Sequence, residues 1–221
     1  MSRLNLDFSK PSVQLGVFAL VALGLLGLLN ALSADRIAEN QQMMLRQTLV
    51  SLLPPGSYDN DVVHDTAQIQ DDRLGSPGAV TIYRARHQGN LIAALVPVVA
   101  PDGYNGKISL LMAVQPDGVL AGVRVLEHHE TPGLGDPIES GKSGWARQFI
   151  GRSLSNPEAA GWRVQRDGGM FDQLAGATIT PRAVVGAVQR ALQVMSDRRQ
   201  EVFIPDSETG SALPKPKTSM P

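Results

Sequence analysis

The hydrophobic and polar positions change pattern several times along the chain. Residues 15–32, LGVFALVALGLLGLLNAL, are apolar apart from Asn30. As a helix with the usual rise per residue, this run would span about 27 Å, close to the hydrocarbon thickness of a bilayer. The pattern therefore predicts a membrane-spanning helix that follows a short stub, residues 1–14.

Charged residues on either side of this run indicate its orientation. Arg3 and Lys10 precede it and Asp35 follows it. Because positive charge favours the cytoplasmic side, we expect the N-terminus in the cytoplasm and the rest of the chain on the outer side. A cleavable signal peptide, with Ala31 and Ser33 near the cleavage site, is the alternative, although its apolar core usually has only ~7–15 residues.

Two further patterns follow the apolar run. Apolar residues recur at helical spacing until Pro54 and Pro55, which predicts a helical connector over residues 33–55. The runs AVTIYRAR and LIAALVPVV then flank HQGN, and KISLLMAVQ and VLAGVRVLEHH flank PDG. These patterns predict two hairpins of an antiparallel sheet. Pro97 has no N–H to donate, so its strand is expected at a sheet edge.

The last part of the pattern predicts a short strand, GWRVQ, and a helix from Pro181 to about Arg198. In this helix Thr180 is the expected N-cap and Pro181 the first helical residue. The expected buried stripe consists of Val184, Val185, Val188, Ala191, Leu192 and Met195. The order of elements predicts an α+β domain over residues 56–200, and the Pro-, Ser- and Lys-rich residues 201–221 are expected to form a disordered tail.

Composition narrows the possible functions. The formal net charge of -1 and the absence of a basic tract give no reason to expect a nucleic-acid partner. The chain has no cysteine, which excludes disulfides, thiolate metal sites and iron–sulfur clusters held by this chain.

The segment HHETPGLG, which begins at His128, invites comparison with zinc hydrolases. No second histidine follows Glu130 at the spacing of an HExxH helix, and Pro132 disfavours such a helix. His128 and His129 are adjacent at a strand end, so their side chains are expected to point to opposite faces. We therefore predict no metal site, and no nucleotide-binding loop or serine elbow assigns a catalytic residue.

The segment FDQLAGATITPR carries the strongest chemical signal. Thr178 lies just before a predicted helix N-terminus, which favours a phosphate, and Arg182 lies one turn into that helix. Gly176 and Ala177 leave room for a bulky group, and Asp172 begins a motif that a modifying enzyme could recognise. A simple tight turn is the alternative interpretation of Gly-Ala-Thr.

These residues carry a resemblance to a known family. DQLAGATIT resembles the Asp-x-x-(Ser/Thr)-Gly-Ala-(Thr/Ser) flavinylation motif of FMN-binding domains, and residues 103–149 resemble the G subunits of Rnf electron transport complexes. The C subunits of the sodium-translocating NADH:quinone oxidoreductases are a related family that shares the Glu-Thr-Pro-Gly-Leu-Gly and Gly-Ala-Thr segments. The resemblance covers nearly the whole chain except the tail.

The resemblance implies FMN joined through its phosphate to the hydroxyl of Thr178, installed by a flavin transferase that uses FAD and Mg²⁺. Asp172, Gly176 and Ala177 match the motif, whereas Ala175 stands where the family usually has Ser or Thr. By the same resemblance a loop would line the flavin, namely Glu130, Thr131, Pro132, Gly133, Leu134 and Gly135. Lys142 and Trp145 are weaker assignments, and Trp145 is equally well explained as a core aromatic.

The function implied by the resemblance is electron relay in an ion-translocating ferredoxin/NAD oxidoreductase complex. The chain would be a single-pass protein of the bacterial inner membrane with a periplasmic main domain, and a redox subunit rather than a stand-alone enzyme. Its partners would be the other subunits of the complex and the flavin transferase. The alternatives are the C subunit of the sodium-translocating enzyme and a scaffold module whose threonine stays unmodified; flavin content separates the scaffold from both redox functions.

Overall fold

The computed structural model describes residues 11, 14–16, 18–25, 46–49, 51–54 and 56–203. They belong to two compact units, residues 1–45 and 46–221. In the first unit residues 14–16 and 18–25 are helical, and Leu15, Phe18 and Leu23 are exposed. No helix among the described residues is both long and apolar enough to cross a membrane. Residues 17 and 26–32 of the predicted span, and residues 33–45, 50 and 55 of the predicted connector, lie outside the described residues.

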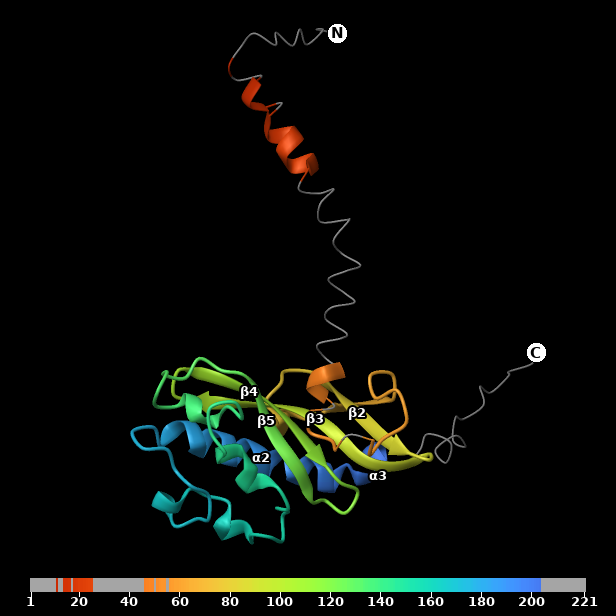
Figure 1. Ribbon diagram of the computed structural model, residues 1–221, viewed down its shortest axis with the longest axis vertical. Helices are drawn as coiled ribbons and strands as arrows, with labels where there is room; N and C mark the ends of the chain where they lie inside the picture. Colours follow the sequence, from red (N-terminus) through yellow and green to blue (C-terminus); the bar gives the residue numbers. More distant parts are fainter. Residues whose placement is uncertain are drawn as a thin grey trace, which may run out of the picture. The chain divides into compact units, whose positions relative to one another are not determined.

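The second unit is built on one sheet (Figure 1), whose antiparallel strands follow one another in sequence order, β1-β2-β3-β4-β5. The predicted antiparallel sheet and α+β class are therefore confirmed for this unit. The strands are β1 (Thr66–Gln70), β2 (Ala79–His87), β3 (Asn90–Gly103), β4 (Gly106–Val114) and β5 (Leu120–Glu127). The strand β1 was not predicted.

Both predicted hairpins are present. Gln88 and Gly89 join β2 to β3 with φ angles of 50° and 78°, the backbone required by a two-residue turn with both central residues at positive φ. The PDG segment turns β4 into β5. A third tight connection, Tyr104 and Asn105, joins β3 to β4, because β3 continues beyond its predicted end to Gly103.

The prediction that Pro97 marks an edge strand is wrong, because β3 is the central strand of the sheet. The register between β2 and β3 runs from His87↔Asn90 to Tyr83↔Leu95, whereas β3 stays paired with β4 well beyond Leu95. Pro97 therefore lies in a part of the strand where pairing with β4 continues after the register with β2 has ended. The missing N–H of Pro97 is tolerated because this part of β3 has no register partner in β2, although β3 is not an edge strand.

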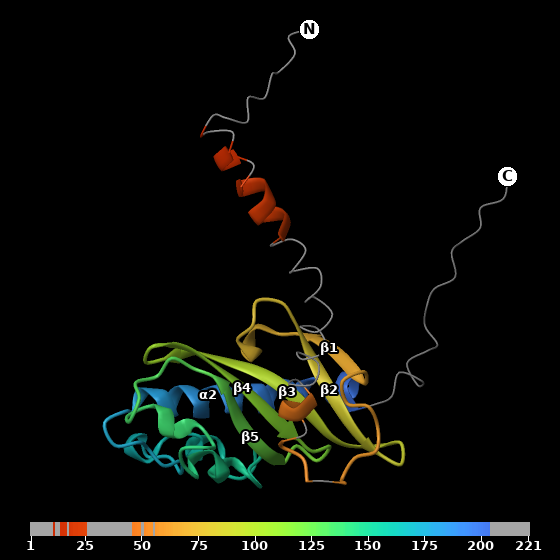
Figure 2. The same ribbon diagram turned by 45° about the horizontal axis from the view of Figure 1, so that its top comes forward.

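One face of the sheet is covered by α2 (Ile179–Asp197), which packs mainly against β3 (Figure 2). Every residue of the predicted apolar stripe is buried. A short helix, α3 (Arg199–Phe203), follows, and Val202 is fully buried in the same core. Ordered structure therefore continues past the expected boundary at residue 200, and residues 204–221 lie outside the described residues.

The opposite face of the sheet is also covered. Leu95 and Leu111 are buried there, and so are Leu49 and Leu53 from the segment before the sheet. A Cβ on Gly122 of β5 would lie 3.1 Å from Leu52 Cδ2, which places this segment against the sheet. Residues 46–49 are helical, as expected for the end of the connector.

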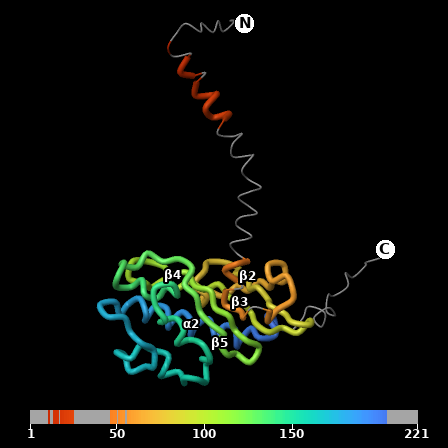
Figure 3. The backbone as a smooth tube through the Cα atoms, in the orientation of Figure 1, coloured from red at the N-terminus to blue at the C-terminus, as the bar shows by residue number. Residues whose placement is uncertain are grey.

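Between β5 and α2 the chain forms short 3-10 helices: η2 (Asp136–Ile138), η3 (Trp145–Phe149), η4 (Ala159–Gly161) and η5 (Gln165–Asp167). Figure 3 shows this stretch as a set of loops beside the sheet. The predicted strand GWRVQ is wrong, because only Val164 pairs, in an isolated bridge with Phe171. Aromatic stacking holds the segment instead: Phe149 stacks on Phe171 with ring centroids 4.9 Å apart, and Trp162 lies 5.0 Å from Phe171.

Candidate functional site

A pocket of about 320 Å³ lies where the loop after β5 meets the beginning of α2. Three segments that are far apart in sequence form its walls: the β3–β4 connection, the loop that begins at Glu130, and the segment that begins at Gly176. The lining residues are Tyr104, Glu130, Thr131, Leu134, Gly135, Gly176, Ala177, Thr178, Ile179 and Thr180. The two sequence segments that were expected to meet at a flavin thus share one pocket.

The loop after β5 folds back on itself through its own backbone. The N–H groups of Leu134 and Gly135 both donate to the carbonyl of Thr131, at 3.1 and 3.0 Å. Gly133 has a φ of 78°, a conformation that favours glycine, and its N–H donates to Asp136 Oδ1 at 2.6 Å. Thr131 and Leu134 of this folded loop line the pocket, while Pro132 and Gly133 do not.

Glu130 anchors the loop with a carboxylate that is almost fully buried, at 4% exposure. Its Oε1 accepts a 3.1 Å hydrogen bond from the backbone N–H of Asn105. Its Oε2 accepts a hydrogen bond from the hydroxyl of Thr180. Both carboxylate oxygens therefore have donors, which a buried carboxylate requires. The pair joins the loop to both the β3–β4 connection and α2.

Thr180 does not cap α2, which corrects the sequence prediction. The helix begins at Ile179, the N-cap is Thr178, and the buried Thr180 hydroxyl is directed to Glu130. Pro181 is the third helical residue, where a missing N–H is still harmless. The sequence prediction of the N-cap used only neighbouring residues, so it did not include the hydrogen bond of Thr180 with Glu130, which lies fifty residues away.

A series of polar contacts links the backbone of Glu130 to His128, Glu139 and Lys142. The Glu130 N–H donates to His128 Nδ1 at 3.0 Å, so the ring proton of a neutral His128 lies on Nε2, which is 2.7 Å from Glu139 Oε1. Lys142 contacts both Glu139, at 2.7 Å, and Asp136, at 3.0 Å. Lys142 is thus a structural residue of the loop rather than part of the pocket lining.

These contacts also change the acidity of the carboxyls. The hydrogen bond from Lys142 lowers the pKa of Glu139, and His128 adds to this effect. The hydrogen bond from Lys142 likewise lowers the pKa of Asp136. Both acids therefore ionise more readily than usual, and the bonds that join them to Lys142 are charge-assisted.

Thr178 lines the pocket, and its hydroxyl does not cap the helix. Its side chain makes no capping hydrogen bond, and its Oγ1 accepts a 3.2 Å hydrogen bond from Arg166 Nη1. Arg182, which the sequence suggested as the cation for a phosphate, instead forms two bonds to Asp167, at 2.7 and 2.8 Å. The guanidinium beside Thr178 is therefore that of Arg166, which sequence reasoning missed.

Asp172 does not line the pocket. Its Oδ1 accepts from Gln165 Nε2 at 2.7 Å, and its carbonyl accepts from the indole N–H of Trp145 at 2.7 Å. Trp145 itself is buried and packs edge-on against Phe149, 5.5 Å between centroids. Trp145 is thus a core aromatic, and Asp172 begins a segment that the core and η5 hold in place.

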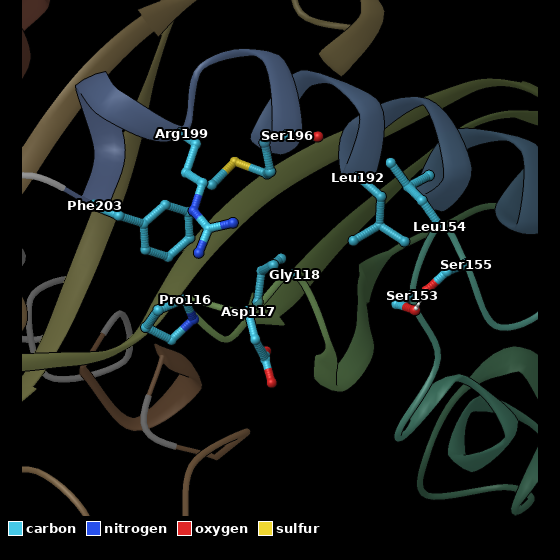
Figure 4. A pocket seen from close by; sticks show the side chains of 12 residues that line it. Pro116, Asp117, Gly118, Ser153, Leu154, Ser155, Leu192, Ser196, Arg199 and Phe203 are labelled. Atoms are coloured by element: carbon cyan, nitrogen blue, oxygen red, sulfur yellow. Dashed lines mark hydrogen bonds between the residues drawn. The ribbon is translucent and has the colours of Figure 1, made fainter.

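A second pocket, of about 170 Å³, lies at the other end of α2 and contains none of the expected site residues (Figure 4). Arg199 and Phe203 border it from α3, and Pro116 and Asp117 from the β4–β5 turn. Across the part of the chain that the structure describes, no cluster of three or more His, Cys, Asp or Glu side chains could hold a metal ion. The pocket at Thr178 is the candidate site, because residues of both expected segments line it.

Comparison with known proteins places the chain in a family. A family model described as FMN-binding domain matches residues 103–193, which include the whole pocket lining, and one described as RnfG N-terminal region matches residues 1–52. The G subunit of the ion-translocating oxidoreductase complex of Pseudomonas aeruginosa is 47% identical, covering 91% of this chain and 94% of its own length. The chain belongs to the family of these G subunits. The G subunit of the same complex of Vibrio cholerae is 40% identical, covering 87% of this chain and 92% of its own.

The FMN-binding domain of this G-family chain is thus the unit that holds the pocket. Among solved structures, NqrC of Shewanella oneidensis is similar with 23% identity and a TM-score of 0.46, covering 64% of this chain and 75% of that chain.

Proposed function

We propose that this G-family protein carries FMN esterified through its phosphate to Thr178 and relays electrons within an ion-translocating oxidoreductase complex. The observation that carries the proposal is the shared pocket. Thr178, whose hydroxyl makes no helix-capping hydrogen bond, lines it together with residues of the loop that begins at Glu130. The match of residues 103–193 to the FMN-binding domain supports the same ligand.

The residues of the pocket fit a flavin. Tyr104, Leu134 and Ile179 line it and are 65%, 44% and 44% exposed, so they offer apolar area that an aromatic ring system could cover. A Cβ on Gly176 would lie 3.0 Å from Leu134 Cδ2, so a side chain at this position would narrow the entrance. Gly176 also has a φ of 78°, which favours glycine.

The chain's own residues would bind and position the FMN. Thr178 supplies the hydroxyl for the phosphoester, and Tyr104, Leu134 and Ile179 supply the apolar contact surface. Glu130 and Thr180 fix the two walls relative to each other. FMN, when bound, supplies the redox chemistry, and the protein tunes it through these surroundings.

The remaining parts of the proposal come from the sequence and from the relatives. Residues 15–32 would anchor the chain in the bacterial inner membrane with the main domain in the periplasm. The relatives are named as subunits of an ion-translocating oxidoreductase complex, so we place other subunits of such a complex among the partners. A flavin transferase that uses FAD would attach the cofactor during maturation.

Mass spectrometry of the full chain purified from its own cells tests the proposal. The intact mass should exceed that of the polypeptide by FMN less one water, and peptide mapping should place the addition on Thr178. An unmodified chain that still assembles with its complex would favour a scaffold role. Flavin attached at Thr180 would overturn the assignment of the attachment site.

A further inference from the structure

We infer that Arg166 binds the Thr178 hydroxyl before flavin attachment and the phosphate after it, as the anion-binding residue of the site. The inference rests on the proposed function. Its basis is the 3.2 Å hydrogen bond from Arg166 Nη1 to Thr178 Oγ1. Arg166 is exposed, and within the described residues this is its one side-chain hydrogen bond. Most of its donors are therefore available to phosphate oxygens.

Arg166 is the middle residue of η5, and the residues on either side of it hold η5 beside the attachment motif. The preceding Gln165 donates from its backbone N–H to the carbonyl of Phe171, at 2.8 Å, and from Nε2 to Asp172 Oδ1, at 2.7 Å. Arg166 then contacts Thr178 at the other end of the same segment. Two consecutive residues of η5 thus contact the first and last residues of the attachment motif.

The third residue of η5 completes the arrangement. Asp167 pairs bidentately with Arg182, one turn into α2, and this pairing lowers the pKa of Asp167. Within the described residues the side-chain hydrogen bonds of Asp167 go to Arg182, and none goes to Arg166. Arg166 therefore keeps free donors beside Thr178, which suit the negatively charged oxygens of a phosphodiester.

The attachment step defines when Arg166 acts. The Thr178 oxygen forms a bond to the FMN phosphorus of FAD, the P–O bond to the AMP phosphate breaks, AMP leaves, and the hydroxyl proton passes to solvent. Arg166 would hold the hydroxyl oxygen in place during this step and bind the non-bridging oxygens of the product. Neither role requires Arg166 to accept a proton.

The test measures the rate of attachment on the full chain in detergent, with purified flavin transferase, FAD and Mg²⁺, by intact mass. Arg166→Gln should slow attachment by about tenfold or more, the scale expected for one charge-assisted hydrogen bond. Arg166→Lys keeps the charge without the planar fork and should give an intermediate rate. Circular dichroism should be unchanged for both variants, because the side chain is exposed.

Arg163→Gln is the matched control. Arg163 is also exposed and also lowers the pKa of Asp167 through its charge, but no hydrogen bond joins it to Thr178 within the described residues. Its attachment rate should stay within about twofold of wild type. In the modified protein, the ³¹P resonance should shift in Arg166→Gln and not in Arg163→Gln.

The outcomes separate the two proposals. If the wild-type chain gains flavin and Arg166→Gln matches Arg163→Gln in both rate and ³¹P shift, the inference on Arg166 is wrong while the proposed function stands. If the wild-type chain gains no flavin under these conditions or in its own cells, the proposed function fails and the inference fails with it.

Discussion

The buried hydroxyl of Thr180 donates to the buried carboxylate of Glu130, and this contact joins the beginning of α2 to the loop after β5. The two residues belong to the two segments that carry the family resemblance. Their contact explains why those segments face each other across one pocket. Because a buried carboxylate needs all its donors, the position of each wall depends on the other.

Removing the hydroxyl should therefore destabilise the domain. Thr180→Val keeps the shape of the side chain but leaves Glu130 Oε2 without this donor, at an expected cost of about 1–3 kcal/mol in the free energy of unfolding. Urea unfolding followed by circular dichroism measures this cost. Thr131→Val is the control, because the Thr131 hydroxyl accepts only an exposed hydrogen bond from Asn105; its effect should stay within about 0.5 kcal/mol. Equal effects of the two substitutions would contradict the assigned role of Thr180.

The two glycines of the loop should respond differently to alanine. A Cβ on Gly135 would lie 2.9 Å from Glu130 Cβ and 3.0 Å from Thr180 Oγ1. Gly135→Ala should therefore separate this pair, cost about 1–3 kcal/mol and reduce flavin attachment. Gly133→Ala meets open space and should cost only about 1 kcal/mol for its positive φ. Thermal unfolding and flavin absorbance of both variants test the contrast, and a larger loss in Gly133→Ala would reverse our interpretation.

Substitution of Thr178 should remove the flavin and leave the fold intact. Its side chain caps nothing and accepts one hydrogen bond from an exposed arginine, so Thr178→Ala should change the unfolding free energy by less than about 0.5 kcal/mol. In-gel flavin fluorescence after denaturation should disappear. Thr178→Ser keeps the oxygen and should retain at least part of the fluorescence. A fluorescent band that persists in Thr178→Ala would mean that another residue is the attachment site.

Much of the fold could be predicted from local patterns. The HQGN and PDG turns and the stripe from Val184 to Met195 are determined by neighbours along the chain, and each is present. The prediction of a strand at GWRVQ was wrong, because Val164 pairs in a single bridge beside the aromatic cluster and not in a continuous series of strand pairs. The prediction that Pro97 marks an edge strand was wrong, because β3 is central and lacks a partner on one side only along the part that contains Pro97.

The site was predicted less completely, for a related reason. The resemblance identified the loop from Glu130 and the motif around Thr178, but it assigned no partner to either. The roles of Thr180 and Arg166 depend on contacts across the fold, and neither residue stands in a pattern that distinguishes it from a helix cap or a surface charge. Tyr104 enters the pocket only because β3 continues to Gly103, beyond its predicted end.

Acid should weaken the domain through Asp71, which is remote from the pocket in sequence. Its hydrogen bonds from Arg73 lower the pKa of Asp71 from 3.8 to about 2, and Arg73 also bonds Asp197 at the end of α2. Since the folded pKa is the lower one, the stabilisation is complete above the unfolded value and is lost as pH falls through the folded value. Asp71→Asn keeps the acceptor for the Arg73 N–H but not the charge. Its deficit in unfolding free energy should be constant near neutral pH and should vanish towards pH ~2; a constant deficit at all pH values would exclude this mechanism.

Membrane topology gives the last prediction. If residues 15–32 span the bilayer with Arg3 and Lys10 on the cytoplasmic side, a C-terminal reporter that is active only outside the cytoplasm should be active. The chain should also stay in membranes after a wash in high salt, because burial of an apolar helix is not screened by ions. Replacing Leu20 and Leu23 with arginine should release it, since each charge at a helix centre costs about 2.5–3.5 kcal/mol on the insertion scale. Release of the wild-type chain as a shortened soluble form would instead identify residues 15–32 as a cleaved signal peptide.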